Sequence, residues 1–112
     1  MSQSTKQATA FVKAIVDGNT RRAHAMLSDE MRAITSTADI ADEYDAMVDD
    51  MGGVESIGEA QEILSDWPEK AQNEIAIVYV PLQGDTYSEA ITVTLAQIDG
   101  KLAISNIEWG RP

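Results

Sequence analysis

The side chains of this sequence that could carry out chemistry are few, and most of them are carboxylates. There is no cysteine, which excludes a thiol nucleophile, a disulfide and a cysteine-based zinc site. His24 is the only histidine, and the sequence contains no Gly-x-Ser-x-Gly motif. Glu89 and Glu108 remain as candidate general bases. Tyr44 and Asn106 could serve them as hydrogen-bond donors.

Metal binding is not favoured by the residue types present. One histidine and no cysteine give transition metals few of the ligands that they prefer. Asp42, Asp45 and Asp49 share one face of an expected helix, but the spacing of a calcium-binding loop is absent. Charge runs of this kind are usually solvated faces. We therefore expect no metal and no cofactor.

The acidic residues are concentrated in one segment. The chain of 112 residues carries 19 acidic and 8 basic residues, for a net charge of −11. Residues 39–74 contain twelve of the acids and one base, which accounts for the whole net charge. Such a balance argues against nucleic acid or a membrane surface as a partner, because both require a basic footprint. The segment 39–74 could attract a basic protein partner, or it could only keep a self-associating protein soluble.

The first half of the chain predicts three helices, because apolar residues repeat there at helical spacing. Gly18 fits the left-handed position that follows a helix, and Gly52-Gly53 ends the third expected helix. Ser28 could start a further turn. The expected N-terminal caps are Ser4 or Thr5, Asn19, and Ser36 or Thr37. The expected buried faces are Ala8, Phe11, Val12 and Ile15 in the first helix and Ile40, Tyr44, Met47, Val48 and Met51 in the third.

After Gly53 the apolar period changes from 3.6 to two, which predicts antiparallel strands. Gly58 predicts a bend in the first strand. Two-residue hairpin turns are expected at Gly84-Asp85 and at Asp99-Gly100. The fold class is therefore α+β, with three N-terminal helices packed on a four-stranded antiparallel sheet in a single domain over residues 1–112. The four expected strands are residues 54–64, 72–82, 86–98 and 101–109.

The two turns fix the strand register, and the register assigns each side chain to one face of the sheet. The face expected to pack on the helices holds Ala76, Val78, Val80, Ile91, Val93, Leu95, Leu102 and Ile104. At one end this face turns polar, and the expected pocket there is lined by Tyr44, Trp67, Tyr87, Glu89, Asn106 and Glu108. The opposite face carries no charge, which is unusual for a solvated antiparallel sheet. We expect it to form a homodimer interface through Ile75, Ile77, Tyr79, Thr92, Thr94, Ile107 and Trp109.

Several segments together resemble the nuclear transport factor 2-like superfamily, which includes ketosteroid isomerase-like and polyketide cyclase-like proteins. The segments are Val16-Asp17-Gly18-Asn19, Ala23-His24-Ala25-Met26-Leu27-Ser28, Gly52-Gly53 and Ile98-Asp99-Gly100-Lys101-Leu102. The sequence is most similar to small bacterial members of unknown function. The resemblance implies a cone, in which a curved sheet wraps around a helix, with an apolar pocket at the open end and a convex face used for dimerisation. Isomerase-type members need an inward-facing acid or base and a donor, but the first helix here offers no inward tyrosine.

The function favoured by these observations is a non-catalytic module that forms a homodimer and binds a small apolar ligand or another protein. The alternative is a small enzyme of the isomerase, cyclase or hydrolase type, with Glu89 or Glu108 as general base. A third possibility is a protein-interaction domain that uses the acidic segment 39–74. The N-terminus shows no basic start followed by an apolar run. We therefore expect a cytoplasmic protein, or an extracytoplasmic one if a leader has been removed.

Overall fold

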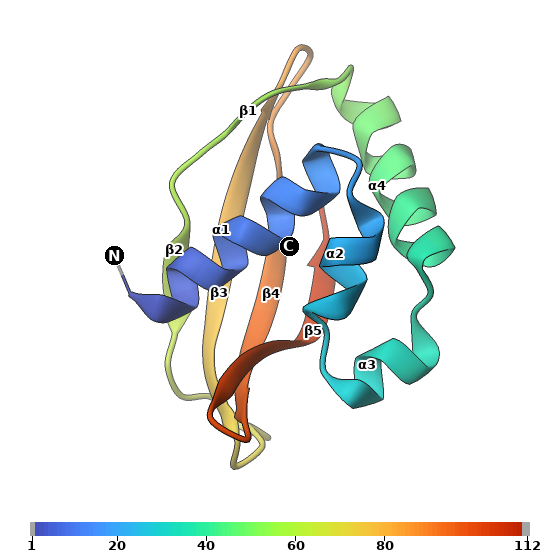
Figure 1. Cartoon of the computed structure of the whole chain (residues 1–112). Coiled ribbons are helices and arrows are strands. Elements are labelled where there is room, and N and C mark those ends of the chain that lie inside the picture. The colour runs from blue at the N-terminus through green and yellow to red at the C-terminus, as the bar shows by residue number, and fades with distance from the viewer. Residues whose placement is uncertain (1, 111–112) are drawn as a thin grey trace.

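Helices precede strands along the whole chain, and they all lie on one side of the sheet (Figure 1). The computed structural model describes residues 2–110. Within that range the expected further turn at Ser28 is a helix of its own, so there are four helices where three were predicted. None of them combines the length and hydropathy needed to cross a lipid bilayer. The helices are α1 (Gln3–Val16), α2 (Thr20–Ala25), α3 (Asp29–Ile34) and α4 (Thr37–Met51).

Side-chain caps determine where the helices begin. Ser2 caps α1 by accepting a hydrogen bond from the Thr5 amide at 3.1 Å. The predicted caps at Ser4 and Thr5 are therefore wrong, and both residues lie in the first turn. The predicted caps are confirmed at Asn19 for α2 and at Ser36 for α4, where a reciprocal capping box satisfies two amide donors.

The sheet has five strands in the described chain, because the first predicted strand is divided in two at Gly58. The Gly58 amide donates to the Pro81 carbonyl at 2.8 Å, and a Cβ at this position would lie 2.8 Å from the Pro81 ring. Both halves pair with the same long strand, residues 74–84, and the two later strands follow it across the sheet in sequence order. The strands are β1 (Val54–Ile57), β2 (Gln61–Leu64), β3 (Glu74–Gly84), β4 (Glu89–Ile98) and β5 (Lys101–Trp109).

One of the two predicted hairpin turns is confirmed. Asp99 and Gly100 both have positive φ angles, of 52° and 78°, as a type I′ turn requires. The predicted two-residue turn at Gly84-Asp85 is wrong, because Leu82 pairs with Glu89 and a longer loop connects β3 to β4. Gly84 instead extends β3, where it pairs with β1.

The hydrophobic core lies between the helices and the sheet. The first and third expected helices correspond to α1 and α4, and their predicted faces are confirmed as core-facing. Tyr44 and Val48 of α4 are half-buried at the edge of the core. The predicted inner face of the sheet is also confirmed, with Leu102 half-buried. The largest fully buried side chains include Phe11, Ile15, Leu27, Ile40, Met51, Leu82, Ile91, Leu95 and Ile104.

One extra residue in β5 reverses the alternation of side chains. Leu95 pairs with Ile104, as predicted, but Thr94 pairs with Asn106. Ser105 is therefore a β-bulge, with no cross-strand partner of its own. Every residue of β5 beyond it points to the face opposite the one that uninterrupted alternation assigns.

Because of the bulge, the predicted faces of four residues of β5 are wrong. Ile107 and Trp109 pack against the core, so their predicted positions in a convex-face interface are wrong. Asn106 and Glu108 pair with Thr94 and Thr92 and project away from the helices, so their predicted inward orientation is also wrong. The physical reason is that an uninterrupted ladder would bury a carboxylate among apolar side chains, at a large desolvation cost.

A second irregularity corrects the position of Ile75. The register between β3 and β4 shifts between Glu74 and Ala76, and Ile75 lies at the shift. Its side chain packs against the core and lines a hollow together with Gln3 and Gln7 of α1. Ile75 therefore lies on the helix side and cannot belong to an interface on the opposite face.

Candidate functional site

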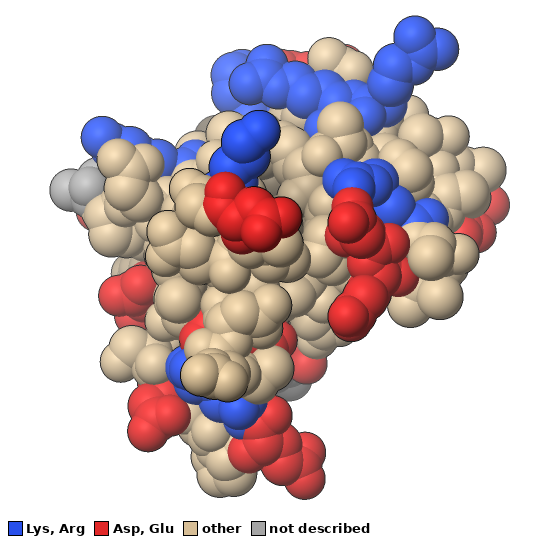
Figure 2. All heavy atoms as spheres, turned by 60° about the horizontal axis from the view of Figure 1, so that its bottom comes forward, with Lys and Arg blue, Asp and Glu red and all other residues tan. Residues whose placement is uncertain are grey.

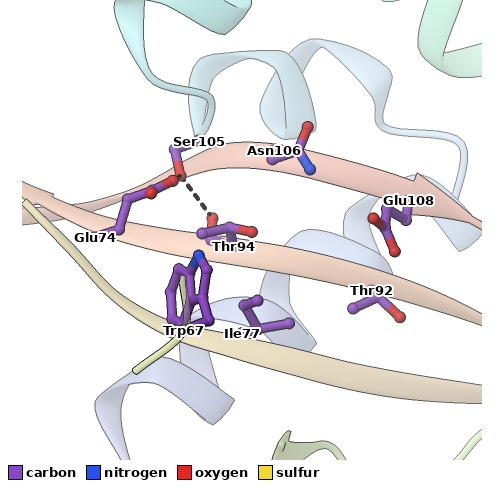
Figure 3. A pocket seen from close by; sticks show the side chains of 8 residues that line it. All are labelled: Trp67, Glu74, Ile77, Thr92, Thr94, Ser105, Asn106 and Glu108. Carbon is purple, nitrogen blue, oxygen red and sulfur yellow. Dashed lines mark hydrogen bonds between the residues drawn. The ribbon is translucent and has the colours of Figure 1, made fainter. Parts of the chain in front are cut away.

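A hollow of about 450 Å³ opens on the face of the sheet that no helix covers (Figure 3). We call this the uncovered face, and the depression the sheet-face hollow. Strands β3, β4 and β5 form its floor, and the loop after β2 brings an indole ring over one end. Its lining residues are Trp67, Glu74, Ile77, Thr92, Thr94, Ser105, Asn106 and Glu108.

The β5 bulge brings polar groups to this hollow. Beyond Ser105, strand β5 presents Asn106 and Glu108 to the uncovered face, beside Thr94 and Thr92 of β4. Among the described residues, the Glu108 carboxylate makes no hydrogen bond and no ion pair. Its charge is therefore available to a molecule in the hollow.

A second carboxylate is held in place at the other end. Glu74 Oε1 accepts a hydrogen bond from the Ala71 amide at 2.8 Å. The Ser105 hydroxyl lies 3.1 Å from Glu74 Oε2 and 3.3 Å from the Thr94 carbonyl oxygen, and it can donate to one of them at a time. Charge-assisted bonds of this kind restrict a carboxylate more strongly than bonds between neutral groups.

Thr92 lines the hollow beside Glu108, and its hydroxyl lacks a partner. The residue is only 5% exposed. Within the described chain, Thr92 Oγ1 is the only buried side-chain polar atom without a hydrogen bond. Leaving a buried hydroxyl unpaired costs roughly 1–3 kcal/mol, and native proteins keep few such groups. The hydroxyl therefore marks a position where a group from outside the chain could complete a hydrogen bond.

The indole of Trp67 forms the aromatic side of the hollow. The ring is half-buried, and the Lys70 ammonium lies 6.0 Å from its centroid, at the outer limit of a cation–π contact. Lys70 does not line the hollow, and no other lysine or arginine of the described residues does. The lining thus combines two carboxylates, an aromatic ring and neutral polar groups.

The structure divides the six predicted pocket residues between different places. Trp67, Asn106 and Glu108 line the sheet-face hollow together. Tyr87 lies in the loop between β3 and β4 and is 39% exposed. Glu89 pairs with Leu82 at the start of β4 and therefore lies on the helix side. These two residues, and Tyr44, do not line the hollow.

Tyr44 lies on α4 and packs against the core from the helix side. Burial raises the pKa of its phenol above the ordinary value of 10.0, and the carboxylates of Asp45 and Asp17 raise it further. The phenol therefore stays protonated near neutral pH. It is on the opposite side of the sheet from Glu108, so the predicted pairing of these two groups does not occur.

Sequence reasoning missed five of the lining residues as site residues. Glu74 and Ser105 were not considered, and Ile77, Thr92 and Thr94 were assigned to a dimer interface. The available signal was the parity of the apolar residues in β5. Leu102 and Ile104 occupy even positions whereas Ile107 and Trp109 occupy odd ones, and only an inserted residue can bring all four to one face.

The helix side of the sheet also has hollows. One of about 550 Å³ lies beside α1 and is lined in part by Gln3, Gln7 and Ile75. Between the helices and the sheet, Met47 and Met51 are buried in the core. A shallow hollow of about 240 Å³ lies between α3, α4 and the end of β5, lined in part by Ile107 and Trp109. His24 is also occupied, because its Nε2 lies 2.8 Å from the Thr35 carbonyl oxygen. In residues 2–110, no three His, Asp or Glu side chains are grouped closely enough to hold a metal ion.

The fold is found in a solved structure. The crystal structure of a Campylobacter jejuni protein described as a "putative NTF2-like transpeptidase" matches with a TM-score of 0.61 over 94% of this chain and 99% of the other. Sequence identity is 22%, so the likeness shows the fold alone. This chain therefore has the nuclear transport factor 2-like α+β fold that its sequence predicts. No family model and no curated protein matches the sequence.

Proposed function

We propose that this protein is a non-catalytic binding module that holds a small molecule in the sheet-face hollow. The fold itself supports many functions, so the proposal must rest on the site. The observation that supports it is the buried Thr92 hydroxyl, which lacks a partner and lines a hollow on the uncovered face. Polar groups from β3, β4 and β5 line the same hollow and could orient a bound molecule.

The arrangement favours binding over catalysis. General acid–base groups are usually tuned by enclosure in an apolar site. Glu108 is exposed on the open face, and Glu89 lies on the helix side. Asn106 shares the hollow with Glu108, but it is exposed as well. The alternative of an enzyme with a general base at Glu89 or Glu108 therefore has less support.

A homodimer through the same face is the second candidate. Ile77, Tyr79, Thr92 and Thr94 form an uncharged stripe across β3 and β4 on the uncovered face. The exposed Leu64 of β2 pairs with Ile77 and extends it. Glu108 counts against a symmetric pairing, because the bulge adds a negative charge beside the stripe in each copy.

The acidic segment 39–74 gives less support to a basic protein partner than its sequence suggests. The segment forms α4, β1, β2 and the loop before β3. Figure 1 shows α4 and β2 at opposite sides of the molecule. The negative charges are therefore spread around the protein instead of forming one patch, and we do not include a basic partner in the proposal.

Native mass spectrometry of the purified protein, before and after denaturation, tests both candidates. The binding proposal predicts added mass that is lost on denaturation of the wild type. Trp67→Ala, which alters only the rim of the hollow, should lose this mass, whereas Gln7→Ala, in a separate hollow beside α1, should retain it. A dimer without added mass would favour the second candidate. A bare monomer, or mass retained by Trp67→Ala, would contradict the binding proposal.

A further inference from the structure

We infer that the sheet-face hollow binds a small organic cation that carries an ammonium group and a hydroxyl group. The inference rests on the proposed function and specifies its ligand class. It joins three separate observations: two carboxylates at the two ends of the hollow, an indole ring at its rim, and an unpaired buried hydroxyl in its floor.

The charges of the lining select against anions. Glu74 and Glu108 both line the hollow, and no lysine or arginine of the described chain does. Figure 2 shows most lysine and arginine side chains in the upper half of the view, with a further basic group near the bottom among acidic side chains. Five of the described basic residues belong to the helices, on the other side of the sheet, namely Lys6, Lys13, Arg21, Arg22 and Arg32. The lining therefore carries net negative charge, and Lys70 beside Trp67 is a cation at its edge.

The aromatic ring distinguishes an ammonium group from a metal ion. Ammonium groups are attracted to the face of an indole, and Trp67 already has the Lys70 ammonium 6.0 Å from its ring. A divalent metal prefers several oxygen ligands in close array. Residues 2–110 contain no group of three His, Asp or Glu side chains that could supply it.

The hydroxyl group of the ligand is inferred from polar groups in the floor of the hollow. Thr92 Oγ1 is buried without a partner, and the neighbouring Asn106 amide can both donate and accept. Ser105 is already engaged with Glu74 or with the Thr94 carbonyl. A ligand hydroxyl that reached Thr92 would satisfy the hydrogen bond that the chain leaves open.

Choline and 3,3-dimethyl-1-butanol are matched probes for this inference. The two molecules have the same shape and hydroxyl group, and differ by a nitrogen in place of a carbon and hence by one positive charge. Binding is measured by NMR titration of the labelled protein, through the Trp67 indole and the amides of β4 and β5. We expect choline to bind about tenfold more tightly than the alcohol. Added salt should weaken choline binding and leave the alcohol unaffected.

Substitutions locate the effect. Glu108→Gln and Glu74→Gln should each weaken choline binding by roughly two- to fivefold without changing the affinity for the alcohol. Asp49→Asn removes the same charge from the exposed side of α4 and should change neither affinity. Lys70→Gln removes the cation beside Trp67 and should strengthen choline binding. Thr92→Val should weaken both probes equally, because both lose the same hydroxyl contact.

The outcomes separate the ligand class from the binding function. Equal binding of the two probes in the hollow would overturn the cationic ligand and leave a binding module. Failure of choline to shift the Trp67 indole, with bound mass still present in the native protein, would also overturn the ligand class alone. If neither probe shifts these signals and the native protein carries no added mass, the binding function fails as well.

Discussion

Deletion of Ser105 tests whether this residue is the one that lies outside the pairing of β5 with β4. Without it, Asn106 follows Ile104 directly, and each later residue of β5 keeps the partner on β4 that it has in the intact chain. Ile107 and Trp109 therefore still point to the core, and Glu108 still points to the uncovered face. The deletion should remove the bulge without moving any side chain to the other face.

The size of the loss follows from the contacts that the deletion removes. The Ser105 hydroxyl lies 3.1 Å from Glu74 Oε2 and 3.3 Å from the Thr94 carbonyl oxygen, and one such hydrogen bond contributes about 1 kcal/mol. A loss of this size is small beside the roughly 5–15 kcal/mol that stabilises a typical domain, so we expect the deletion variant to fold. A deletion that moved side chains across the sheet would cost about 4 kcal/mol or more, because it would expose two large apolar side chains and turn a carboxylate inward.

The control is Ser105→Ala, which keeps the chain length and the bulge. It removes only the hydroxyl contacts at 3.1 Å and 3.3 Å with Glu74 and the Thr94 carbonyl, which is worth about 1 kcal/mol. Urea unfolding followed by far-ultraviolet circular dichroism gives the free energy of unfolding for both variants. A deletion variant that is less stable than Ser105→Ala by about 4 kcal/mol or more would refute the assignment of Ser105 as the bulge residue.

Three further predictions concern single positions. Thr92→Val removes the unpaired buried hydroxyl and should raise the free energy of unfolding of the ligand-free protein by about 1 kcal/mol, measured by urea titration; a loss of stability would show that the hydroxyl is satisfied. Gly84→Ala should destabilise by about 1–3 kcal/mol in the same assay, because its Cβ would lie 2.5 Å and 2.8 Å from the carbonyl oxygens of Tyr87 and Gly53, and a neutral result would contradict this close approach. Burial raises the pKa of Tyr44 above 10.0, so ionisation of this phenol disfavours the folded state. The free energy of unfolding should be retained below about pH 10 and fall at higher pH, and it should fall less in Tyr44→Phe. Parallel pH profiles of the two proteins would contradict the burial of this phenol.

The parts of the fold that follow from local chemistry could be predicted from the sequence. The caps at Asn19 and Ser36 need only a side-chain oxygen before a helical apolar period. The Asp99-Gly100 turn needs only two residues that tolerate positive φ. The apolar faces of the first and third helices and of β3 and β4 follow from periodicity, and they are the faces that pack in the structure.

The sequence-based predictions that were wrong concern features that depend on contacts between distant segments. Gly84-Asp85 has the composition of a tight turn, but Gly84 is needed because β1 and the β3–β4 loop approach its backbone closely. Ile75 belongs to an unbroken apolar run, so alternation could not show that it faces α1. The hollow itself was missed because strict alternation in β5 placed Asn106 and Glu108 on the wrong side of the sheet.

The register of β5 beyond Ser105 determines both the core and the candidate site. If all residues of β5 were paired in regular alternation, Ser105 included, the uncovered face would receive two apolar side chains, Ile107 and Trp109, and no carboxylate from β5. Because Ser105 lies outside the ladder, the apolar pair completes the core while Asn106 and Glu108 reach the hollow. Substitutions of Glu108 can therefore change binding without disturbing the core, whereas a change that brought Ser105 into the ladder must affect both at once.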